Sequence, residues 1–228
     1  DFAASRNIVM AANFHGGYEV VNYPWDTWER LHADDVWYRH ISRNFADSAQ
    51  EYSPPGYMES LDDGITNGYA WYPVHGGRQD FMNYWHGCRE TVIEISTIKL
   101  VSANTLPSYW EYLRVSLFDD IGEALYGVRG VATDADVGLP VGVTITVLNH
   151  DIDSSMVFSD PETGNYHRMI EPGTWDIRFD HEDYEPYIAY GVVENDNDLT
   201  ALDVQLVPYA SQFVCGDANG DDNANPMD

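Results

Sequence analysis

The amino-terminal part of the chain alternates short apolar runs with polar stretches, which is the pattern of buried strands. Residues 8–12 are apolar and lead into Asn13-Phe14-His15-Gly16-Gly17, so they predict a strand that ends at a histidine. A run this short also suits a buried helical segment, and the pattern alone leaves that alternative open. Residues 91–96 are β-branched or apolar except at Glu94, and they predict a second buried strand.

Two longer segments show the spacing of amphipathic helices. In residues 34–50, Trp37, Ile41 and Phe45 lie on one face, and acidic residues occupy the first turn. Residues 106–127 predict a second helix, which has capping-box spacing at its start and a glycine at its end. The predicted buried stripe of this helix consists of Trp110, Leu113, Leu117, Ile121 and Leu125.

After residue 127 the apolar residues recur at every second position, as in half-buried strands. The predicted strands are residues 128–133, 143–148, 166–170, 174–179 and 202–207. Turn residues such as Glu171-Pro172-Gly173 separate them, and this spacing is typical of a small antiparallel β-sandwich. No acid, base and nucleophile cluster in this part, so the pattern predicts a structural or binding module.

The excess of acidic residues limits the kinds of partner that the protein can bind. The 228 residues include 38 acidic and 11 basic ones, which gives a formal charge of -27. Such a chain repels nucleic acid and anionic membranes, and it attracts metal ions or basic peptides. No apolar run has the length of a membrane span. The two cysteines, Cys88 and Cys215, imply no disulfide framework, although they could pair with each other.

The residues at the ends of the two predicted amino-terminal strands are candidates for chemistry. Ligands gather at the carboxyl ends of strands in open α/β sheets, where a neutral imidazole can bind a metal. His15 suits that role, although an isolated His-Gly-Gly is more often a loop in which the imidazole bonds to the backbone. Burial would make Glu94 a stronger base, suited to general-base catalysis, whereas on an edge strand it would face water.

An aromatic stretch with two consecutive glycines forms another candidate, residues 67–80, which contains Tyr72. It follows a segment, residues 51–68, whose Pro, Gly, Asp and Ser content predicts a long loop. The stretch suits a lid or pocket wall whose tyrosine donates a hydrogen bond, and it equally suits an aromatic surface loop.

The carboxyl-terminal residues repeat oxygen-bearing side chains at the spacing of a calcium loop. The candidate calcium ligands are Asp217, Asn219, Asp221, Asn225 and Asp228. The glycine expected at the sixth loop position is Asp222 here, and the last ligand is Asp rather than Glu. The alternative is a disordered acidic tail.

Three blocks of sequence together resemble the zinc metallocarboxypeptidases of the N/E subfamily. The first comprises Asn13-Phe14-His15-Gly16-Gly17 and Asn22-Tyr23-Pro24-Trp25-Asp26; the second runs from Gly64-Ile65-Thr66-Asn67-Gly68-Tyr69-Ala70-Trp71-Tyr72-Pro73 through Gly76-Gly77 to Gln79-Asp80; the third is Glu94-Ile95-Ser96. The resemblance implies an α/β fold, with a partial mixed-sheet carboxypeptidase domain followed by a small antiparallel, transthyretin-like β-sandwich. The implied domains are the carboxyl-terminal half of the catalytic domain (residues 1–126), the sandwich (residues 127–208), and a linker with a truncated dockerin-like calcium loop (residues 209–228).

The resemblance also implies a role for individual residues. His15 resembles a zinc ligand, and Glu94 resembles the general base that takes a proton from zinc-activated water. Tyr72 resembles the mobile tyrosine that closes over the carboxyl end of the substrate. Asp26 and Gln79 resemble the pair that contacts a basic terminal side chain, which implies release of C-terminal Lys or Arg.

The sequence departs from the family pattern in one major respect. None of the eight histidines is followed by Glu three residues later, so the His-x-x-Glu zinc motif is missing, as is the Asn-Arg pair that binds the substrate carboxylate. A catalytic zinc needs three protein ligands. We therefore expect a fragment that begins within a catalytic domain and is inactive by itself.

The expected parent protein is a secreted, extracellular enzyme that requires zinc, with calcium at its tail. Its implied partners are the basic C-termini of peptides or proteins and a cohesin-like protein that binds the tail. The alternative function is a non-catalytic binding module of a larger calcium-dependent extracellular assembly.

Overall fold

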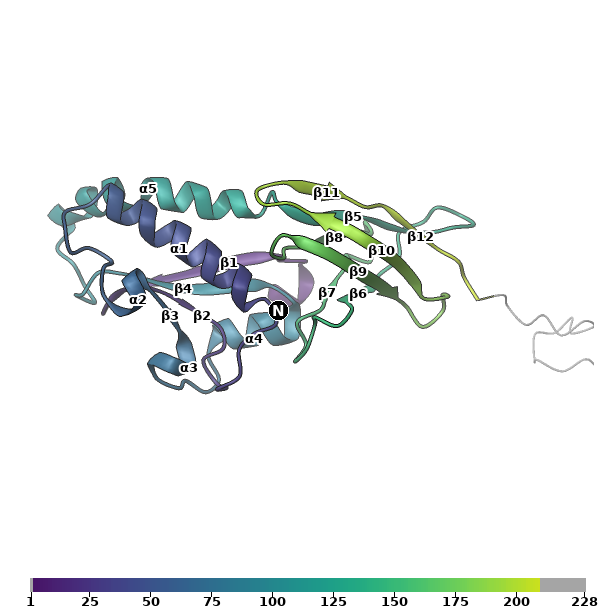
Figure 1. Ribbon diagram of the computed structural model, residues 1–228, viewed down its shortest axis with the longest axis horizontal. Helices are drawn as coiled ribbons and strands as arrows, with labels where there is room; N and C mark the ends of the chain where they lie inside the picture. Colours follow the sequence, from purple (N-terminus) through teal and green to yellow (C-terminus); the bar gives the residue numbers. More distant parts are fainter. Residues whose placement is uncertain (1, 210–228) are drawn as a thin grey trace, which may run out of the picture.

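The computed structural model describes residues 2–209, whose amino-terminal half is built on a four-stranded mixed sheet (Figure 1). Its strands are β1 (Met10–His15), β2 (Glu19–Tyr23), β3 (Ile65–Asn67) and β4 (Arg89–Ile95), in the spatial order β1-β4-β2-β3. β1 runs parallel to β4 and β2 runs parallel to β3, while β2 and β4 are antiparallel. The predictions of a mixed sheet and of a buried strand at residues 91–96 are confirmed, whereas the first predicted strand is found as β1 with half-buried and exposed residues rather than buried ones.

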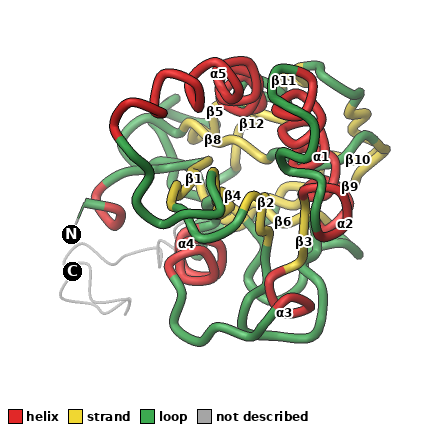
Figure 2. The backbone as a smooth tube through the Cα atoms, turned by 90° about the vertical axis from the view of Figure 1, so that its left-hand side faces the viewer, coloured by secondary structure: helices red, strands yellow, loops and turns green. Residues whose placement is uncertain are grey.

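Helices cover both faces of this sheet (Figure 2). α1 (Asp35–Glu51) and α5 (Leu106–Glu123) pack side by side on one face, and α4 (Arg78–His86) lies on the other, against β4. The short elements are α2 (Leu61–Gly64), α3 (Gly68–Trp71) and two 3-10 turns, Ala3–Ser5 and Ala103–Thr105. The core between α1, α5 and the sheet includes Val21, Tyr38, Ile41, Phe45, Ile65, Ile93 and Leu113. No helix in the described residues is long and apolar enough to cross a membrane.

The sequence predicted α1 well and the buried face of α5 poorly. Trp37, Ile41 and Phe45 are buried as their spacing predicted. On α5, only Leu113 of the predicted stripe is fully buried. Trp110, Ile121 and Leu125 are 50%, 67% and 58% exposed. The predicted buried face was wrong because α5 buries a different face, with Leu113 and Ser116 inward and Tyr109 and Tyr112 packed against the core. The helix also ends at Glu123, before the predicted glycine stop.

The predicted loop of residues 51–68 was partly wrong. Its second half contains α2 and β3, because β3 pairs with β2 from Val21↔Ile65 to Tyr23↔Asn67. The aromatic stretch after it is likewise not a single loop, since it contains α3 and the start of α4.

The carboxyl-terminal half consists of two sheets around a second apolar core. The strands are β5 (Gly127–Asp134), β6 (Thr144–Val147), β7 (Val157–Phe158), β8 (Asn165–Arg168), β9 (Gly173–Asp180), β10 (Tyr187–Glu194), β11 (Leu199–Ala201) and β12 (Val204–Leu206). One sheet has the order β10-β9-β6-β7, and in the other β5 pairs with β8, β11 and β12. The five predicted strands are found, but β11 and β12 run parallel to β5, so the arrangement is not wholly antiparallel.

A buried ion network joins the two halves. Arg168 at the end of β8 donates from Nη2 to Asp34 Oδ1 at 2.8 Å and to Asp151 Oδ1 at 2.6 Å. Arg89 at the start of β4 reaches the other oxygen of Asp34 at 2.7 Å. The two guanidinium groups hold the pKa of Asp34 below its usual range despite complete burial. The network therefore consists of balanced opposite charges that only the folded chain brings together.

His150 extends this network. Its ring nitrogens lie 3.0 Å from Asp151 Oδ1 and 3.4 Å from Glu171 Oε1. Burial alone lowers the pKa of His150, but the bonds to Asp151 and Glu171 and the charge of Asp34 outweigh it and raise the pKa to about 9. His150 is therefore an imidazolium at neutral pH.

Candidate active site

A cavity of about 500 Å³ opens at the carboxyl ends of β1 and β4. It is lined by His15, Gly16, Gly17, Tyr18, Trp71, Tyr72, Glu94 and Lys99. Because β1 and β4 are parallel neighbours, their register sets His15 directly beside Glu94. The sheet thus brings together two candidate residues that are far apart in the sequence.

His15 and Glu94 are within reach of each other but differ in their exposure. His15 Nδ1 lies 3.4 Å from Glu94 Oε2, with the imidazole about half exposed and the carboxylate buried. Gly17 makes room for the carboxylate, since a Cβ there would lie 3.0 Å from Glu94 Oε2, and its φ of +146° also favours glycine. The cavity therefore presents an accessible imidazole beside a sheltered carboxylate, as a base acting on a bound substrate requires.

The residues around His15 do not by themselves fit a catalytic zinc. Such a site needs three protein ligands, and among the described residues no group of three converging ligands includes His15, whose Nδ1 contacts Glu94 Oε2 and the carbonyl oxygen of Gly16. Within residues 2–209, the one set of three possible ligands that converges within 4.8 Å is Asp34, His150 and Glu171, which belongs to the ion network. Arg89 and Arg168 already neutralise Asp34 there, and two positive charges oppose binding of a metal ion.

Asp26 and Gln79 form a second buried pair. Asp26 Oδ1 accepts hydrogen bonds from Asn22 Nδ2 at 3.0 Å and from Gln79 Nε2 at 3.1 Å. Burial raises the pKa of Asp26 to about 6, opposed by the Asn22 bond and assisted by the charge of Asp80. The carboxylate is charged above that pH.

The backbone around Asp26 is fixed by a residue whose role the sequence did not reveal. Asp80 accepts from the backbone N–H groups of Asp26 and Thr27, at 3.0 and 2.8 Å. Gly68 must also lack a side chain, because a Cβ there would lie 1.7 Å from Asp26 Oδ1. Asp80 follows Gln79 in the aromatic stretch, but only the fold shows that it orients the Asp26 loop.

Two side chains on the cavity wall complete the site. Tyr72 is half exposed and lines the cavity together with Glu94, and its pKa is raised by burial and then by the charges of Glu94 and Asp26. Lys99 also lines the cavity, and sequence analysis missed it. The signal was present, since Lys99 is the only lysine in a chain of charge -27.

The candidate calcium ligands between Asp217 and Asp228 lie outside the described residues, as does Cys215.

The thiol of Cys88 is buried. Burial raises the pKa of its thiol to about 12, which keeps the thiol protonated and unreactive at neutral pH.

Comparison with known proteins gives consistent matches. A family model described as zinc carboxypeptidase matches residues 1–116. The chain is 31% identical to carboxypeptidase D of Drosophila melanogaster and 29% identical to carboxypeptidase D of Rattus norvegicus, over 93% and 94% of its length, and it spans 16% of each relative. It is 31% identical to the carboxypeptidase N catalytic chain of Rattus norvegicus, over 80% of this chain and 42% of that protein. The chain therefore corresponds to a minor part of each relative's length.

Proposed function

This chain belongs to the zinc carboxypeptidase family, and we propose that it is part of an enzyme of the N/E subfamily that hydrolyses C-terminal peptide bonds and releases Lys or Arg. The observation that carries the proposal is a set of two buried carboxylates, Glu94 beside His15 and Asp26 beside Gln79, with Tyr72 on the wall of the cavity that Glu94 lines. One carboxylate is placed for proton transfer, and the other is placed for charge recognition.

Each residue has a distinct role in this proposal. Glu94 accepts a proton from the attacking water and passes it to the leaving amine. Asp26, held by Gln79 and Asn22, binds the cationic terminal side chain, and a neutral side chain would leave the buried carboxylate without a partner. Tyr72, half exposed on the wall, closes over the carboxyl end of the substrate.

The cofactor of the whole enzyme is zinc under this proposal, with His15 as one ligand. Two further ligands are needed, and residues 2–209 do not place them beside His15. We therefore propose that activity belongs to a longer protein and that the 228-residue chain alone is inactive.

The remaining parts of the proposal concern the rest of the chain. Residues 1–126 form the carboxyl-terminal half of a catalytic domain, residues 127–208 a transthyretin-like module, and residues 209–228 the start of a dockerin-like calcium module with a cohesin-like partner. The support is the second core around β5–β12 and the spacing of acidic residues in the tail. An extracellular location follows from the same proposal.

The test uses the full-length, zinc-loaded protein that contains this chain and two blocked peptides that differ only in ending with Arg or Phe. We expect faster release of Arg, loss of turnover in Glu94→Gln, and loss of the Arg preference with residual turnover in Asp26→Asn. Glu111→Gln, an exposed change on α5, is the matched control and should leave both rates unchanged. A zinc-loaded protein that cleaves neither peptide refutes the proposal.

The incomplete set of ligands at His15 favours one second candidate, a module that binds basic peptides without cleaving them. It predicts saturable binding of the Arg-terminated peptide, dependent on Asp26, with no product even when the full-length protein holds zinc. Turnover by that protein excludes this candidate.

A further inference from the structure

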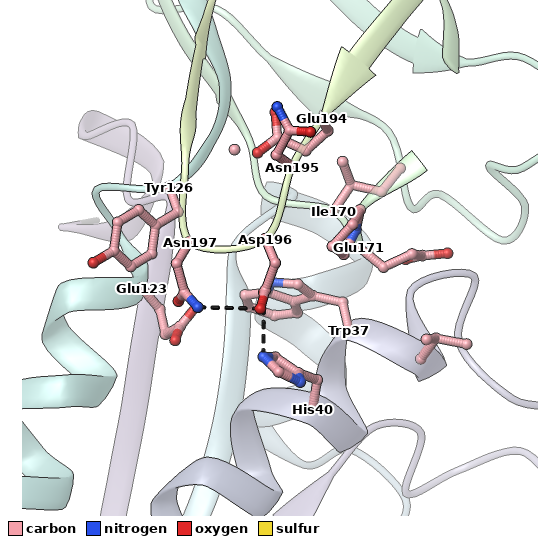
Figure 3. Close-up of a pocket in the computed structure, with 13 residues that line it drawn as sticks. Trp37, His40, Glu123, Tyr126, Ile170, Glu171, Glu194, Asn195, Asp196 and Asn197 are labelled. Carbon is pink, nitrogen blue, oxygen red and sulfur yellow. Dashed lines mark hydrogen bonds and ion pairs between the residues drawn. The ribbon is translucent and has the colours of Figure 1, made fainter. Parts of the chain in front are cut away.

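A second cavity, of about 260 Å³, lies between the helical half and the strand half, away from the residues that line the candidate active site (Figure 3). Trp37 and His40 line it from α1, Glu123 from the end of α5, and Glu194 and Asp196 from β10 and the loop after it. None of these groups takes part in the proposed hydrolysis.

The cavity collects negative charge without a matching cation. Glu123, Glu171, Glu194 and Asp196 line it, and no lysine or arginine does so among the described residues. His40 Nε2 lies 3.5 Å from Asp196 Oδ1, an exposed contact that Figure 3 shows together with the bond from Asn197 to Asp196. Glu171 is paired with His150, and the single exposed imidazole of His40 does not balance the other three carboxylates.

Glu194 is the group that points to a ligand. Its residue is 3% exposed, and its Oε2 atom has no hydrogen-bond partner. Burial raises the pKa of Glu194 above its usual value, and hydrogen bonds from Thr200 and Gly127 to the carboxylate only partly oppose this rise. A buried acceptor without a donor is unfavourable, and a bound group that donates N–H bonds would relieve it.

Glu123, at the end of α5, also lines the cavity. Its pKa is raised to about 7, first by burial and then by repulsion from Asp120, Asp196 and Asp119. A cation in the cavity would stabilise the ionised form of Glu123 and reduce this repulsion.

The geometry disfavours a metal ion as that cation. Within the described residues, no three of the lining carboxylates and imidazoles offer ligand atoms within 4.8 Å of one another. Among the lining residues, only Glu171 belongs to a group of three converging ligands, the one with Asp34 and His150, and there it is bonded to His150. Carboxylates that do not converge on one point suit a larger cation with several N–H donors, and Trp37, Ile170 and Pro172 offer an apolar wall for its alkyl part.

We propose that this cavity binds an organic cation, an alkylammonium or alkylguanidinium group, through Glu194 and Glu123. The same chemistry is found in free amines and in the Lys or Arg side chains of a polypeptide. This binding does not depend on the proposed hydrolysis, since it uses neither His15 nor Asp26.

The test follows the Trp indole N–H signals of the 228-residue chain by NMR, with Trp37→Phe assigning the Trp37 signal. The probes are agmatine, N-acetyl-Gly-Arg-Gly-amide and calcium chloride. We expect agmatine to shift the Trp37 signal saturably and Glu194→Gln to weaken binding by roughly tenfold or more, because a charge-assisted bond is lost. Glu123→Gln, the second variant should Glu194→Gln fail to fold, is expected to weaken binding several-fold.

Two controls separate this cavity from the candidate active site. Asp26→Asn and the exposed change Glu111→Gln should leave the shift of Trp37 unaltered. Binding of the peptide as well as agmatine identifies a polypeptide side chain as a possible occupant, and binding of agmatine alone identifies a free amine; both support the proposal. It is overturned if Trp37 does not respond, if neither Glu194→Gln nor Glu123→Gln changes the affinity, or if calcium binds there in preference to agmatine.

Discussion

Replacing Arg168 by methionine should destabilise the fold more than any surface charge change. Its guanidinium is completely buried and bonds to two carboxylates, Asp34 and Asp151, that are themselves buried. Methionine keeps most of the volume and removes the charge, so the two carboxylates lose a shared partner. The effect on the free energy of unfolding should therefore be electrostatic rather than the result of a cavity.

The magnitude follows from what remains after the change. Asp34 keeps Arg89 at 2.7 Å, whereas Asp151 keeps the contact with His150 at 3.0 Å and the hydrogen bond from the backbone N–H of Val147 at 2.8 Å. Breaking a buried ion pair by removing one partner costs about 3–5 kcal/mol. With a urea dependence of about 2 kcal/mol per molar, the unfolding midpoint should fall by about 2 M.

The assay is urea unfolding at pH 7, followed by circular dichroism. Arg114→Met is the matched control, since Arg114 bonds to Glu111 on the exposed surface of α5 and its loss should cost less than about 0.5 kcal/mol. If Arg168→Met loses under about 1 kcal/mol, as little as the control, the network does not hold the two halves together and the reasoning is wrong.

Three further predictions concern pH, backbone space and metal. Folding raises the pKa of His150 to about 9, so protonated His150 stabilises the fold fully below about pH 6.5. This stabilisation, up to about 3 kcal/mol, is lost as the pH rises to 9. Urea unfolding at pH 6.5 and pH 9 should show the loss, and His150→Gln should abolish the difference in stability between the two pH values. Gly68→Ala should destabilise by about 2 kcal/mol or more, because its Cβ meets Asp26, whereas Gly122→Ala, within α5 and facing open space, should stabilise by up to about 1 kcal/mol. After dialysis at neutral pH the 228-residue chain should retain well under one zinc per chain, and about one tightly held zinc would show that His15 finds further ligands.

Local patterns predicted those elements whose partners lie nearby or whose burial is uniform. α1 carries its apolar stripe on the face that its neighbours cover, so Trp37, Ile41 and Phe45 were assigned correctly. α5 has apolar residues on several faces, and which face is buried depends on α1, more than fifty residues earlier in the chain. Spacing alone could not decide it.

The same distinction applies to the sites. Sequence patterns identified His15 at the end of one predicted strand and Glu94 within another as separate candidates, and the parallel register of β1 and β4 places them together. Asp80 and Arg168 could not be assigned in this way. Their partners lie 54 and 134 residues away, and isolated polar residues carry no periodic signal that reports such contacts.

The end of β8 limits where the chain could be cut or recombined. Arg168 enters the ion network of the helical half, and the next residue, Met169, is buried in the apolar core of that half. A shortened protein that ended before β5 would expose that core and leave Asp34 with Arg89 alone. Gene fusions or chimaeras that exchange one half should therefore carry the segment around Arg168 and Met169 with the helical half, or redesign both surfaces together.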